Sequence, residues 1–215
     1  MKLHLRLLMW LLSLLAAACQ ENETMPARDY PRLNTLDVTK VSDKGATLRA
    51  EFSKRGNFEI LRYGFVWSEG EQPVIGNAER VIFDGNIQSR EFSATIFSRL
   101  ASDRVYYVRP FVQTKDHMVY GKQVSFASRG SLPPLIVDFF PRQGAIGDTV
   151  SIAGNGFSYR IGFNIVTFNS SRASVASMTD TLLRVIVPNV SPGESSVSVE
   201  IVGKKATASQ KFILQ

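Results

Sequence analysis

Residues 196–201 read Ser-Val-Ser-Val-Glu-Ile, a strict alternation of polar and apolar side chains. Successive side chains of a β-strand point to opposite faces, so this period of two is typical of a strand with one buried face. From Leu33 onward similar short runs recur between clusters of Gly, Pro, Asn, Asp and Ser, with almost no helical period. The sequence therefore predicts an all-β fold. The other clear runs are residues 46–52, 63–67, 80–83, 91–96, 105–112, 123–126, 135–139, 149–153, 164–168, 182–187 and 206–214.

The set of predicted strands is interrupted once, where Arg129, Gly130 and Ser131 are followed by Pro133 and Pro134. Such a stretch ends one unit and stiffens the path to the next. A chain of 215 residues has room for two domains of about 100 residues. We expect sandwiches at residues 32–128 and 134–215, joined by a linker at 129–133 that carries few contacts, so that each domain folds alone.

The first residues are of a different kind. Lys2, His4 and Arg6 precede an apolar run, residues 7–15, and three alanines at 16–18. An apolar run this short does not cross a bilayer as a permanent helix, which needs about 20 residues. Residues 1–18 are therefore predicted to be a secretory signal peptide that is removed.

Cys19 is the only cysteine of the chain and follows the three alanines directly. The stretch resembles the lipobox of bacterial lipoproteins, although Leu15 lies four residues before the cysteine, where the usual leucine lies three before. The resemblance implies a lipid on Cys19, a lipidated linker at residues 19–31, and attachment to the outer membrane or cell surface. Residues 20–23, Gln-Glu-Asn-Glu, resemble the surface-export tag of Bacteroidetes lipoproteins, and a solvated linker explains them equally well.

The remaining composition argues against an enzyme. Without the signal peptide, His117 is the only histidine, so a catalytic triad would have to use this one residue, which lies on a predicted loop. A zinc site lacks converging ligands, and no metal or cofactor is expected. Paired carboxylates, as glycosidases use, stay open, because no spacing singles out a pair. Gly154 and Gly156 are not followed by the lysine of a phosphate-binding loop. The formal net charge of +6 includes Lys2 and Arg6. The other basic residues are scattered, and an exported protein is not expected to bind nucleic acid.

Residues 32–128 resemble the fibronectin type III-like domains of Bacteroidetes surface proteins. The resemblance implies that Tyr106 places its ring in the core and returns its hydroxyl to the backbone. The residues that carry it are Tyr63, Gly64, Phe65, Val66, Trp67, Ser68, Leu100, Tyr106, Tyr107, Val108, Arg109, Tyr120, Gly121, Val124, Ser125 and Phe126.

Residues 134–214 resemble an IPT/TIG domain, which implies a second immunoglobulin-like sandwich. The residues that open the match are Ile136, Phe139, Pro141, Gly144, Gly147, Asp148, Val150, Ile152, Gly154, Gly156 and Phe157. Those that continue and close it are Asn164, Val166, Phe168, Asp180, Thr181, Leu182, Val185, Val187, Pro188, Gly193, Val197, Val199, Gly203, Ala206 and Phe212.

Two groups of side chains are candidates for ligand binding. Tyr159, Arg160 and Phe163 crowd a predicted loop between Phe157 and Asn164, as contact surfaces do. The second group is Tyr107, Arg109 and Phe111, which alternate with Tyr106 and Val108 and are expected to point outward if those two lie in the core. A structural contact of the loop, or a solvated sheet face, explains the same residues.

These features together predict a non-catalytic lipoprotein of the outer membrane or cell surface. Its resemblances imply a binding module in glycan acquisition in a Bacteroidetes bacterium. The alternative is a structural spacer or adhesin subunit that meets other surface proteins, for example through edge strands. The sequence leaves open the identity of the ligand and the orientation of the anchored protein.

Overall fold

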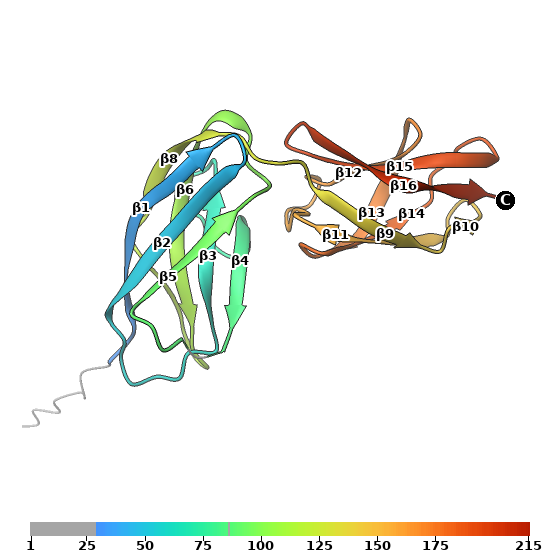
Figure 1. Ribbon diagram of the computed structural model, residues 1–215. Helices are drawn as coiled ribbons and strands as arrows, with labels where there is room; N and C mark the ends of the chain where they lie inside the picture. The colour runs from blue at the N-terminus through green and yellow to red at the C-terminus, as the bar shows by residue number, and fades with distance from the viewer. Residues whose placement is uncertain (1–28, 86) are drawn as a thin grey trace, which may run out of the picture.

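The computed structural model describes residues 29–85 and 87–215 and places only strands among them, so the expected all-β class is confirmed (Figure 1). The predicted signal peptide and Cys19 lie outside the described residues. Within those ranges there is no helix of the length and hydropathy that a membrane span requires.

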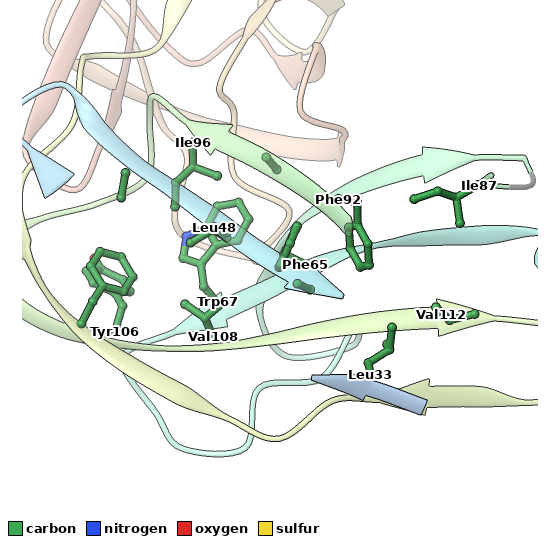
Figure 2. Close-up of a cluster of buried hydrophobic side chains, with 14 of the residues drawn as sticks. Leu33, Leu48, Phe65, Trp67, Ile87, Phe92, Ile96, Tyr106, Val108 and Val112 are labelled. Atoms are coloured by element: carbon green, nitrogen blue, oxygen red, sulfur yellow. The ribbon is translucent and has the colours of Figure 1, made fainter. Parts of the chain in front are cut away.

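The first domain is a sandwich of two antiparallel sheets. One sheet has the order β1 (Arg32–Ser42), β2 (Gly45–Lys54), β5 (Glu91–Ile96). The other has the order β4 (Glu79–Asp84), β3 (Arg62–Ser68), β6 (Ser102–Gln113), and the long β6 pairs with both β7 (Met118–Tyr120) and β8 (Val124–Arg129). Figure 2 shows the core between them, where Leu48 of one sheet lies near Phe65 and Trp67 of the other.

Tyr106 takes the position that the sequence predicts. Its ring is buried, and its hydroxyl accepts a hydrogen bond of 2.9 Å from the amide of Ala101. Burial raises the pKa of Tyr106, while the Ala101 amide opposes the shift because it stabilises the phenolate. The side chain thus ties the start of β6 to the loop before it.

The strands of the second domain pair in one continuous order and enclose a core of their own. Neighbouring strands are antiparallel, except the first two in the order, which are parallel. The order is β10 (Gln143–Gly144), β16 (Lys204–Leu214), β15 (Gly193–Ile201), β12 (Ile165–Phe168), β13 (Ser171–Met178), β14 (Leu182–Ile186), β11 (Thr149–Asn155), β9 (Leu135–Phe140). The perpendicular rings of Phe168 and Phe212, 5.2 Å apart, lie in the core. The buried residues of the second domain form a core separate from that of the first domain.

The two ends of the first domain differ in what they contact. The chain enters β1 at the end away from the second domain (Figure 1). There Tyr30 stacks on Phe58 at 5.4 Å and meets the edge of His117 at 4.8 Å. The opposite end carries the loop between β5 and β6 and the start of β4, and these face the second domain.

Candidate binding surfaces at the domain junction

A buried ion pair lies where the two domains meet. Glu79 begins β4, and Arg99 lies in the loop between β5 and β6, where its positive φ of 67° turns the chain. Their side chains are 5% and 8% exposed, with 3.5 Å between the arginine Nη1 and a carboxylate oxygen. We call Glu79 and Arg99 the junction pair. Burial lowers the pKa of Arg99, and the carboxylate of Glu79 opposes that shift.

The second domain supplies further hydrogen bonds to the junction pair, although the Nε of Arg99 stays buried without a partner. The hydroxyl of Ser158 and the amide of Tyr159 both donate to the Glu79 carboxylate. In return, Arg99 donates to the carbonyl of Phe157 at 3.4 Å. Buried charges are tolerated when they are paired and hydrogen-bonded in this way. Beyond the linker, the domains thus meet through a buried, hydrogen-bonded contact that the expectation of few contacts did not foresee.

Tyr159 belongs to this junction. Its ring lies 4.0 Å from the guanidinium carbon of Arg80 and 5.8 Å from that of Arg99. Burial raises the pKa of Tyr159, and the carboxylate of Asp180, to which its hydroxyl hydrogen-bonds, raises it further. The structure thus places this predicted ligand residue, half-buried, as a contact between the domains.

The rest of the loop is exposed but held in shape. We call residues 159–163 the junction loop. Its base is closed by Asn164, whose side chain accepts from the amide of Ser158 and donates to its carbonyl, both at 2.8 Å. The guanidinium carbon of Arg160 lies 3.7 Å from the centroid of the Phe163 ring, and Ile161 and Phe163 are exposed. Arg160 and Phe163 therefore form one stacked unit on the surface, as a contact surface requires.

The second predicted group does not form an outward platform. Phe111 is completely buried, so its assignment as a ligand contact is wrong. It packs with Val66 and Ala78 on the outer face of the sheet, in a small core that the segment before β4 covers. Arg109 is half-buried: its Nε donates to the carbonyl of Gly121 at 3.0 Å, and its guanidinium carbon lies 4.7 Å from the Tyr120 ring centroid.

Tyr107 is half-buried on the same outer face, opposite Ser68 of β3 and Ser125 of β8. It is separated along β6 from the buried Phe111. The structure therefore brings Arg160 and Phe163 together, and it does not bring the Tyr107 group together as one surface.

The described surface has hollows to which the sequence pattern did not point, among them the following two. One, of about 220 Å³, lies at the junction and is lined by Phe97, Ser98, Leu132, Pro133, Leu135, Asn155 and Gly156; we call it the junction groove. The other, of about 300 Å³, is lined by Phe52, Ser53, Lys54, Arg55, Gln88, Ser89 and Arg90 of the first domain. Among residues 29–85 and 87–215, no three His, Cys, Asp or Glu side chains gather as a metal site would need.

Comparison with known proteins finds several likenesses. A cyclomaltodextrin glucanotransferase from Geobacillus stearothermophilus is 37% identical over 67 residues, which are 31% of this chain and 9% of that enzyme. The chain thus matches less than a tenth of the length of this curated relative.

Several solved structures are also similar to this chain. SGBP-B from a complex xyloglucan utilization locus in Bacteroides uniformis has 20% identity and a TM-score of 0.35, over 86% of this chain and 49% of that one. An auxiliary nutrient binding protein from Bacteroides thetaiotaomicron has 25% identity and a TM-score of 0.35, over 39% of this chain and 21% of that one.

The comparison with protein families concerns the second domain. Residues 134–213 match the model of the IPT/TIG domain, so the resemblance noted from the sequence is confirmed for this sandwich.

Proposed function

We propose that the chain is a non-catalytic surface lipoprotein that binds glycan and presents its binding surface at a fixed domain junction. The observation that carries the proposal is the buried junction pair, Glu79 and Arg99, which the second domain completes through Ser158 and Tyr159. A ligand surface is most effective when a rigid scaffold holds it, because little ordering entropy is then lost on binding. The junction loop begins at this contact.

The chemistry of the junction loop suits a glycan. The exposed ring of Phe163 offers an apolar face at a low cost in rotamer entropy. The guanidinium of Arg160, stacked on that ring, offers several N–H donors to hydroxyl or carboxylate groups. In this proposal Tyr159 positions the loop and does not touch the ligand.

The anchor of the proposed lipoprotein is Cys19. The described chain enters β1 at the end away from the junction (Figure 1), and in this proposal the lipid-bearing Cys19 precedes that end of the first domain. Cys19→Ala should release the protein from the membrane fraction or leave it unprocessed, and immunoblots of separated fractions measure this. Unchanged membrane attachment of that variant would contradict the anchor.

Glycan binding is tested with the whole protein. Affinity electrophoresis in gels containing xyloglucan, amylose, mannan or polygalacturonate should retard the wild type in at least one polysaccharide. Phe163→Ala should reduce the retardation, while Arg49→Ala, a substitution in an exposed ion pair of the first domain, should leave it unchanged. No retardation of the wild type in any of the four gels would overturn the glycan proposal.

A structural spacer or adhesin subunit is the second candidate, and one observation favours it. β9 is the last strand in the order of its sheet, and it exposes Leu135, Val137 and Phe140. An exposed apolar edge strand is a template for pairing with a strand of another chain. A Val137→Lys variant that keeps glycan binding but loses assembly with surface partners would support this second role.

A further inference from the structure

We propose that the junction groove holds one ring of a neutral carbohydrate, with Phe97 as the stacking platform. The inference rests on the proposed glycan function and assigns it a site apart from the stacked pair of Arg160 and Phe163. Phe97 lies in the first domain, Leu132 in the linker and Leu135 in the second domain, so the groove exists only when the two domains are docked.

The apolar walls of the junction groove are unusually open to solvent. Phe97 is 58% exposed, Leu132 43% and Leu135 57%, and the three side chains line one hollow. Single exposed apolar residues are ordinary on a protein surface. Three large ones around one concavity, at a boundary between domains, form the kind of surface at which ligands bind.

The backbone holds these walls in place before any ligand arrives. The amide of Leu132 donates to the carbonyl of Phe97 at 2.8 Å, which fixes the linker against the first domain. Leu135 pairs with Asn155 in the β9–β11 ladder. Gly156 has a φ of +80°, and a Cβ at this position would lie 2.6 Å from the Ser98 hydroxyl oxygen, so the domains meet there as closely as a glycine allows. A preformed groove loses little entropy on binding.

The lining residues select a neutral ligand with an apolar face. None of the seven is charged, so a phosphate, a sulfate or a uronic acid would lose water there without gaining a counter-ion. The ring of Phe97 can cover the C–H face of a sugar, and the amide of Asn155 can both donate to and accept from its hydroxyls.

The size and the hydrogen bonding of the groove favour a sugar over a peptide. Its volume of about 220 Å³ is below the roughly 300–1,000 Å³ of drug-sized pockets, so it accommodates one ring of a longer chain. A peptide that adds a strand needs unpaired backbone groups. Within the groove the carbonyl of Phe97 already accepts from the amide of Leu132, so strand addition is left to the outer edge of β9.

The test is calorimetric titration of the whole protein with cellotetraose, maltotetraose, xylotetraose and mannotetraose. At least one should bind the wild type, and Phe97→Ala should weaken that binding by about tenfold or more, as loss of a central aromatic anchor does. Phe97→Trp should retain it. The matched control is Phe140→Ala, which removes an exposed ring from the other end of β9 and should leave affinity unchanged. All variants should melt near the wild-type temperature because both rings are exposed.

The outcomes separate the two proposals. Wild-type binding that Phe97→Ala does not weaken, while Phe163→Ala does, overturns the groove and leaves the glycan function at the junction loop. Absence of binding to all four tetrasaccharides, together with no retardation in the polysaccharide gels, overturns both. Binding of an apolar peptide such as Leu-Val-Phe-Phe, with the same loss in Phe97→Ala and no tetrasaccharide binding, overturns the carbohydrate assignment.

Discussion

Three consecutive residues of the first domain, Phe97, Ser98 and Arg99, meet the second domain in opposite ways. Arg99 is buried, paired with Glu79 and hydrogen-bonded to the second domain, whereas Phe97 leaves most of its ring in water. Ser98, between them, lies against Gly156. The comparison teaches that docking and ligand presentation are separable. Buried polar contacts hold the domains together, and exposed apolar side chains beside them remain available to a ligand.

The largest expected effect on stability comes from breaking the buried junction pair. Glu79→Ala leaves the guanidinium of Arg99 buried without its counter-ion, and removing one partner of such a pair costs about 3–5 kcal/mol. Urea unfolding of the whole chain measures the loss in free energy of unfolding.

The matched control is Glu91→Ala, which removes one partner of the exposed pair with Arg49 and should cost less than about 1 kcal/mol. Replacing both members of the junction pair, Glu79→Leu with Arg99→Met, should recover much of the loss because no buried charge remains. Equal losses in Glu79→Ala and Glu91→Ala would mean that the junction pair does not hold the domains.

A smaller effect concerns pH and Tyr159. Its pKa is raised, so the folded protein holds the phenol proton more tightly than the unfolded chain. The two states are equally protonated below the ordinary tyrosine pKa of about 10. Above it the unfolded chain ionises first, and stability falls as pH rises through the folded pKa. Tyr159→Phe should weaken this alkaline loss, as measured by urea unfolding at a series of pH values.

Tyr106 supplies the internal reference for that experiment, because its pKa is also raised, chiefly by burial, but its hydroxyl is bonded within the first domain. Its share of the alkaline loss should persist in Tyr159→Phe. An alkaline loss identical to that of the wild type would show that the Tyr159 hydroxyl is not confined at the junction.

The smallest effect on stability is expected from a change in the exposed part of the junction loop. Phe163→Ala removes a surface ring that stacks on Arg160, and surface changes of this kind stay within about 0.5 kcal/mol. Thermal melting measures it. A drop of several degrees would place Phe163 in the structural contact and remove it from the proposed ligand surface.

Much of the fold could be predicted from alternation, but the pairing of strands could not. The run at 91–96 coincides with β5, and those at 63–67 and 149–153 fall inside β3 and β11. The pattern missed β13, because its small and polar residues give little contrast between the faces. Consecutive strands β4 and β5 join different sheets, since period two reports which face is buried and not which neighbour is paired.

The candidate site was predictable only in part. The crowded loop at 159–163 was visible as aromatic residues that the sandwich does not require, yet the sequence could not tell that Tyr159 meets Arg80 of the other domain. Phe111 was misassigned because alternation assumes one buried face, and here a loop segment covers the second face as well. Phe97 carried no signal, since its role depends on two segments that are distant in sequence.

The two domains can dock closely at Gly156 because the side chain of this residue is only a hydrogen atom. The space in which its Cβ would lie is occupied by Ser98, and its positive φ disfavours any other residue. A methyl group there acts as a wedge that pushes the two sandwiches apart and strains the turn. A substitution at this single position would therefore disturb the contact between the domains before it altered either core.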